Sequence, residues 1–216
     1  LCTKNHTKEM NKREGYLVVA FGWIVMTLSG TLPYLFTGAI PSFSNAVFET
    51  ISGYTTTGST ILNDIEALPE GVLFWRSLTH WIGGMGIIVL AVAILPMLGI
   101  GGMQLYRAET PGPVKDSKLT PRIKETAIAL WSIYLGLTCV CAIAYWGAGM
   151  SGFDAVCHSF STIAIGGFST HDASIGYFDS WAIEAIAIFF MILFNCPISL
   201  ARCIISPDHS VSFRYD

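Results

Sequence analysis

The sequence predicts an all-α integral membrane protein that is built from a repeated helix–loop–helix unit. Hydrophobic residues make up 52% of its 216 residues, only 12% are charged, and the mean hydropathy is +0.56. Long uncharged apolar runs of this kind are typical of membrane-spanning helices. A polar turn, Ser52 to Thr60, lies between two such runs. Because non-helical backbone at membrane depth must line a cavity or be buried in protein, we expect a re-entrant loop there.

The polar turn occurs twice, at an offset of 109 residues. The shift superimposes two sets of four residues, Thr56, Thr57, Gly58 and Ser59 on Ile165, Gly166, Gly167 and Phe168. The same shift places Asn45-Ala46-Val47 over Asp154-Ala155-Val156, and Gly38 over Gly147. One offset therefore aligns the preceding helix, the approach and the turn, which predicts an internal repeat.

The first unit is expected within residues 1–98. Tyr16 to Gly38 carries no charge and is long enough to span a membrane, which takes about 20 residues. Pro41 then begins a segment that ends at Gly53 and is too short to span, with proline at the favoured first helical position. A second long apolar segment follows at 74–98.

Three features of the segment 74–98 bear on its packing. Gly83, Gly84 and Gly86 permit a close approach to a neighbouring helix. Trp75 and Trp81 are expected in an interfacial aromatic belt. His80, beside Trp81, is expected to pack at the same interface, and an intramembrane hydrolase built on His80 is a distant alternative because no metalloprotease or nucleophile-elbow motif occurs.

The second unit is expected at 126–194, after a proline-broken basic connector at 99–125. It repeats an uncharged span, a short entering helix at 151–162 and a turn at 163–169, and a further span begins at Trp181. From Asn195 the pattern fails, so residues 195–216 are expected to be an atypical tail. This tail and a first residue other than Met predict a truncated chain.

The charge distribution predicts the orientation. Nine of the twelve Lys and Arg residues lie in 1–15 and 99–125, and none lies between Gly38 and Trp75 or between Gly147 and Trp181. The positive-inside rule then makes the basic stretches cytoplasmic and opens both re-entrant loops to the outside. The acidic residues of these stretches, Glu49 included, are expected near the outer mouths, where they attract cations. No basic stripe with aromatics suggests a nucleic-acid partner.

A glycine-containing turn after a short helix is suited to binding a dehydrated cation. Rings of main-chain carbonyls replace the hydration shell in potassium channels. Glycine allows backbone conformations that residues with a Cβ avoid, and the partly negative end of the short helix faces the ion. We expect coordination by the carbonyls of Thr56, Thr57, Gly58, Ser59, Ile165, Gly166, Gly167 and Phe168. No covalent chemistry is implied, so an enzyme is not expected.

Three stretches resemble the TrkH-type subunit of bacterial Trk/Ktr/HKT potassium transporters. They are Ser52 to Thr60, His80 to Gly86 and Ile163 to Thr170, within a match of about residues 15–194. The resemblance implies two of four helix–pore-loop–helix units in a multi-pass protein of the bacterial inner membrane. With glycine at 58 and 167, it also implies potassium preferred over sodium.

The resemblance also implies partners. They are membrane lipid, a cytoplasmic TrkA-type nucleotide-binding regulatory subunit and, for the complete protein, a second copy in a homodimer. The alternative is a non-conducting truncated membrane fragment that at most associates with intact subunits. The six cysteines form no Cys-x-x-Cys pair and are expected to be small packing residues rather than a zinc or disulfide framework.

Overall fold

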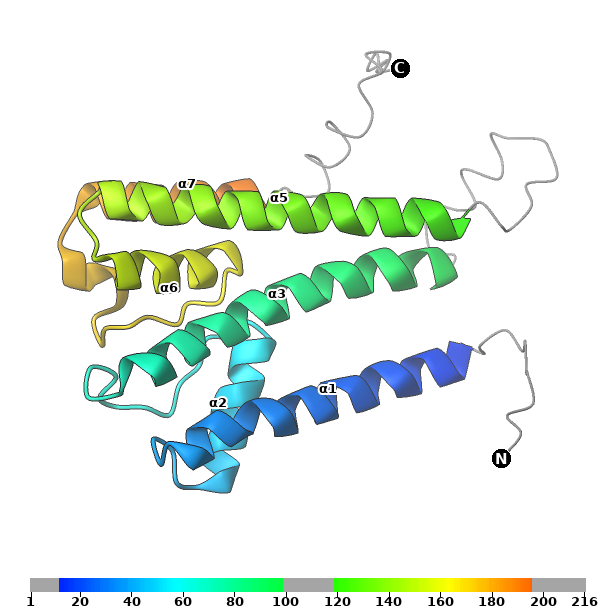
Figure 1. Cartoon of the computed structure of the whole chain (residues 1–216), viewed down its shortest axis with the longest axis horizontal. Helices are drawn as coiled ribbons and strands as arrows, with labels where there is room; N and C mark the ends of the chain where they lie inside the picture. Colours follow the sequence, from blue (N-terminus) through cyan, green and yellow to red (C-terminus); the bar gives the residue numbers. More distant parts are fainter. Residues whose placement is uncertain (1–11, 99–118, 196–216) are drawn as a thin grey trace, which may run out of the picture.

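The computed structural model describes residues 12–98 and 119–195, and in these two ranges the regular structure is helical without strands (Figure 1). The helices in chain order are α1 (Lys12–Phe36), α2 (Phe43–Tyr54), α3 (Glu70–Leu98), α5 (Leu119–Gly147), α6 (Gly152–Ile163), the 3-10 helix η2 (Ser174–Phe178) and α7 (Trp181–Asn195). The predicted all-helical fold class is confirmed. The predicted tail after Asn195 and most of the connector lie outside the described residues.

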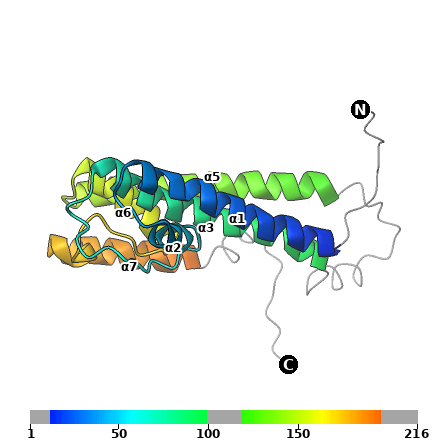
Figure 2. The same cartoon turned by 90° about the horizontal axis from the view of Figure 1, so that it is seen from below.

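Each unit encloses one short helix between longer ones. Helix α2 packs against α1 and α3, and α6 packs against α3, α5 and α7. In Figures 1 and 2 both short helices lie at the end of the molecule where α1 and α5 finish and where α3 and α7 begin. The two short helices therefore enter the structure from the same side.

Three helix boundaries differ from the sequence predictions. Ser42 is the N-cap of α2, so Pro41 precedes the helix instead of occupying its first turn. Helix α3 begins at Glu70, one turn before the apolar run at 74–98. Helix α5 begins at Leu119, so Pro121 lies in a helical first turn, where its missing N–H has no intrahelical partner to lose. The last residues of the predicted connector are therefore helical.

The outer surface of the long helices suits lipid. Within the described residues, α1 and α5 carry the windows that are long and apolar enough to cross a membrane, Val19–Phe36 and Leu130–Gly147, and only 22% of each window is buried. A core helix of a soluble protein passes the same length test but is mostly buried. Large apolar side chains such as Phe21 (68% exposed), Trp146 (67%) and Trp181 (81%) face outward instead.

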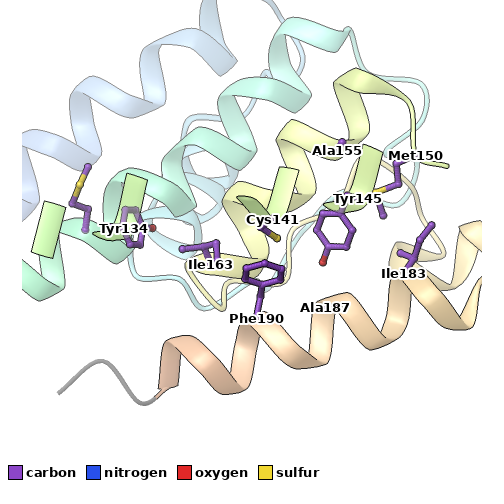
Figure 3. Packing of buried hydrophobic residues seen from close by; sticks show 10 residues of the cluster. Tyr134, Cys141, Tyr145, Met150, Ala155, Ile163, Ile183, Ala187 and Phe190 are labelled. Carbon is purple, nitrogen blue, oxygen red and sulfur yellow. The ribbon is translucent and has the colours of Figure 1, made fainter. Parts of the chain in front are cut away.

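Two apolar clusters hold the units together. The larger one joins α3, α5, α6 and α7, and in Figure 3 Cys141 and Tyr145 lie between Ile163 and Phe190. Tyr145 donates to or accepts from the hydroxyl of Thr162 at 2.7 Å, which satisfies its buried phenol. The smaller cluster joins α1, α2 and α3 through Tyr34, Ala46 and Val72. Burial of these side chains fixes α2 and α6 against their neighbours.

Two adjacent glycines of α3 contact the ends of both short helices. A Cβ at Gly83 would overlap the main chain of Tyr54, the last residue of α2. A Cβ at Gly84 would lie 3.1 Å from the Cβ of Ala164, which caps α6. Gly86 has no neighbour within 4 Å of an added Cβ. The expected close approach is therefore made by Gly83 and Gly84, one for each unit.

Replacing Gly83 by alanine is expected to lower the free energy of unfolding by about 1–3 kcal/mol, because an added methyl must displace backbone. The matched change Gly86→Ala meets open space and is expected to be neutral or to stabilise the helix by about 0.5–1 kcal/mol. Unfolding of the purified chain by SDS in mixed micelles measures both. Equal effects of the two substitutions would contradict this packing.

Candidate functional site

The two short helices end in the same backbone motif. In α2 the N–H of Thr56 donates to the carbonyl of Gly53 and that of Thr57 to Ser52. In α6 the N–H groups of Ile165 and Gly166 donate to Thr162 and Ser161, at positions shifted by 109 residues. These paired bonds form a Schellman motif, which satisfies carbonyls at a helix end and reverses the chain.

Both motifs place a β-branched residue in the left-handed region, where glycine is usual. Thr56 and Ile165 each have φ of +54°. A residue with a Cβ costs about 1–2 kcal/mol in this conformation. Non-glycine residues held there cluster at functional sites, since surrounding structure must impose the strain. Its occurrence at equivalent positions of both units marks these turns as the candidate site.

Two residues further on, both turns use a glycine that requires positive φ. Gly58 has φ of +76° and Gly167 of +89°. A Cβ at Gly58 would overlap the carbonyl oxygen of Gly166, so the turns touch backbone to backbone. A Cβ at Gly167 would meet nothing within 4 Å. The structure thus brings the two predicted sets of residues together at one place.

The carbonyl of Ser59 has a partner within its own unit. The hydroxyl of Ser52 donates to this oxygen at 2.6 Å. Of its two lone pairs, one is therefore used to fix the turn on α2. This bond holds the end of the first turn in a single conformation.

A buried ion pair lies beside the turns. Nε of Arg76 donates to Oε1 of Glu49 at 2.8 Å, and the two side chains are 1% and 0% exposed. Glu49 also accepts from the hydroxyl of Thr60 at 2.8 Å and from the N–H of Ile61 at 3.2 Å. Glu49 is therefore not an acidic group at the outer mouth, as the sequence suggested. It fixes the chain leaving the first turn.

Arg76 also reaches the second turn. Its Nη1 donates to the carbonyl of Ser169 at 3.0 Å, and its Cζ lies 4.0 Å from the centroid of the Phe168 ring. Such a contact joins the positive guanidinium to the negative face of the ring. One side chain of α3 thus connects the short helix of the first unit to the turn of the second.

In the second unit the position equivalent to Glu49 is His158. Its Nδ1 lies 2.9 Å from the carbonyl of Asp154, so this nitrogen carries the proton. Its Nε2 then accepts from the hydroxyl of Ser169, also at 2.9 Å. Ser169 is equivalent to Thr60, and the position equivalent to Arg76 is Ala185. A neutral pair therefore closes the second turn where an ion pair closes the first.

His80 and the two tryptophans were expected at a membrane interface, and this prediction is wrong. His80 is 0% exposed, its ring stacks on Phe168 with centroids 4.0 Å apart, and a Cβ at Gly166 would overlap it. Trp75 and Trp81 point inward, where their ring N–H groups donate to the carbonyl of Gly30 and the hydroxyl of Thr138. Packing behind the second turn determines their positions.

The outer surface near the turns joins acidic groups of both units. Nδ1 of His171 lies 3.1 Å from Glu66, and its Nε2 lies 3.5 Å from Asp154 at the entrance of α6. Burial raises the pKa of Asp154, but hydrogen bonds from Thr170 and Ser151 outweigh it, so the pKa lies below its usual value. Asp154 therefore stays ionised and caps the helix.

Arg76 is the functional residue that the sequence reasoning missed. It was counted with the start of an apolar span, and Glu49 with a solvated acidic stretch. A signal was present, since a single charge inside a membrane-spanning segment is usually paired and functional. Two opposite charges, one in each of two adjacent predicted helices, could have indicated the pair.

Long apolar helices around two re-entrant loops, each entered by a short helix and left by a strained turn, define a helical membrane protein with a paired pore-loop site. Comparisons with known proteins agree. A family described as TrkH, cation transport protein, matches residues 1–214. The chain belongs to the TrkH family of cation transport proteins.

Several relatives are similar over most of this chain. It is 58% identical to the Trk system potassium uptake protein TrkH of Vibrio parahaemolyticus over 198 residues and 55% identical to that of Escherichia coli K12 over 199 residues. These matches cover 91% and 92% of this chain and 41% of each relative. The crystal structure of the potassium transporter TrkH from Vibrio parahaemolyticus superimposes with a TM-score of 0.79 and 48% identity, over 95% of this chain and 41% of that one.

Proposed function

We propose that this chain contributes two ion-coordinating segments to a potassium uptake pathway across the bacterial inner membrane. Main-chain carbonyl oxygens of both turns replace the water around the ion. These oxygens belong to Thr56, Thr57, Gly58, Ser59, Ile165, Gly166, Gly167 and Phe168. The observation that carries the proposal is the contact between Gly58 and Gly166, because two rows of carbonyls can share one ion only when they lie side by side.

The short helices support a cation rather than an anion. Helices α2 and α6 both end at the turns, so their partly negative C-terminal ends point toward the bound ion. Glycine at positions 58 and 167 favours potassium over sodium. The relatives compared above are named as potassium uptake proteins.

The orientation and the partners follow from the charge distribution and from the relatives' names. The turns open to the periplasm, and the basic stretches 1–15 and 99–125 lie in the cytoplasm. The names refer to a Trk system, which implies several components. A TrkA-type nucleotide-binding subunit binds the cytoplasmic face, the complete transporter is a homodimer, and lipid surrounds the outer faces of α1, α5 and α7.

A non-conducting fragment is the second candidate, and the observation that favours it is length. The chain spans about 41% of the relatives it matches. Two turns do not close a ring of four carbonyl rows, so the other rows must come from additional polypeptide. Alone, the chain then only associates with intact subunits.

Complementation of a bacterial strain that lacks potassium uptake separates these candidates. One plasmid expresses this chain alone. Another expresses the Vibrio parahaemolyticus relative with its aligned segment replaced by residues 12–195 of this chain, hereafter the chimera. We expect the chimera to restore growth at low potassium and the chain alone to fail. A chimera that reaches the membrane but does not restore growth contradicts the proposed function, and growth on the chain alone contradicts the fragment candidate.

A further inference from the structure

The Glu49–Arg76 pair is not needed to close a turn onto its own short helix. The second unit does this with the neutral His158 and Ser169, and with alanine at position 185 in place of the arginine. A buried ion pair is also weak evidence for stability, since removing two charges from water offsets much of their attraction. The charged pair of the first unit must therefore be explained by what Arg76 does beyond Glu49.

Arg76 takes a carbonyl of the second turn out of the coordinating row. The bond from Nη1 to the oxygen of Ser169 directs that oxygen toward α3. The preceding residue, Phe168, is held by the guanidinium on its ring and by the stacked His80. The row of free carbonyls in the second turn thus ends at Phe168, at a point fixed by a side chain of the first unit.

The same guanidinium is fixed from the other side by the first turn. Glu49 accepts from its Nε while holding Thr60 and Ile61, the residues that follow Ser59. A planar guanidinium presents its N–H groups at fixed angles, so the two bonds set one distance between the outer ends of the turns. A lysine ammonium supplies the charge without this geometry.

We propose that Glu49 and Arg76 are positioning residues that set the spacing between the two carbonyl rows and thereby the preference for potassium over sodium. The proposal rests on the proposed function of the turns. Ions that differ only in radius are distinguished by the positions of their ligands, so a small shift of one row changes the preference before it abolishes uptake.

The test compares initial uptake rates of potassium and sodium by the chimera in potassium-depleted cells. Arg76→Lys keeps the charge and loses the fork, whereas Glu49→Asp keeps the charge and withdraws the carboxylate by one methylene. Each is expected to lower the ratio of potassium to sodium uptake about tenfold at equal protein in the membrane. The control is Glu70→Gln, which removes an exposed carboxylate at the start of the same helix α3 and leaves the ratio unchanged.

Each outcome decides the proposal. A ratio within about twofold of the parent chimera for both variants would overturn it, because geometry would then not matter. A loss of both variants from the membrane would also overturn it, since the pair would serve folding alone. If the parent chimera itself takes up no potassium, the proposed function has failed, which is a separate result from the loss of selectivity in the variants.

Discussion

Replacing Gly58 by alanine is expected to reduce potassium uptake by the chimera about 100-fold or more, because a small misplacement of coordinating groups has effects of that size. The alanine must adopt φ of +76°, and its methyl must displace the carbonyl oxygen of Gly166. The substitution therefore disturbs both rows at once. Initial rates of potassium uptake by depleted cells measure the effect.

Gly167→Ala is the matched comparison. It imposes the same kind of backbone strain, at φ of +89°, but its methyl meets no atom within 4 Å. Strain of about 1–3 kcal/mol predicts a loss of about tenfold, smaller than that at Gly58. Membrane levels of both variants must equal those of the parent chimera. Equal losses at the two glycines would contradict the contact between the turns.

Removing the guanidinium without its partner is expected to destabilise the chain strongly. Arg76→Met leaves the carboxylate of Glu49 buried and without its cation, which costs about 3–5 kcal/mol. The double substitution Glu49→Gln with Arg76→Met removes both charges and keeps an oxygen that can accept from Thr60. The double variant is therefore expected to be more stable than Arg76→Met alone.

Unfolding of the purified chain by SDS in mixed micelles measures this difference. The second single substitution, Glu49→Gln, completes a double-mutant cycle and isolates the interaction between the two side chains. Additive effects of the two single substitutions would contradict a direct ion pair. Such a result would assign the loss in Arg76→Met to packing against Phe168 instead.

The sequence predicted the architecture well because that architecture depends on short-range patterns. Uncharged runs long enough to span a membrane identified α1, α3 and α5. The offset of 109 residues paired the two turns, and the structure gives the same backbone motif at both. Glycines 83 and 84 marked a close approach, although the sequence did not say to which segments.

The side-chain network could not be predicted in the same way. Glu49 and Arg76 are far apart in the sequence, and only the packing of α2 on α3 brings them together. His80 looked interfacial because Trp81 follows it, yet its environment is determined by Phe168 on a distant turn. The positive φ of Thr56 and Ile165 contradicts the local preference of β-branched residues, so tertiary structure must impose it.

The touching turns also restrict how such a duplicated protein can diverge. Since the carbonyl of Gly166 occupies the space beside Gly58, a longer loop in either copy would push its twin aside. Insertions and deletions are thereby excluded from both copies together. Two segments that began as one gene fragment now inherit changes as a pair, and exchanging one of them between distant relatives would require exchanging the other.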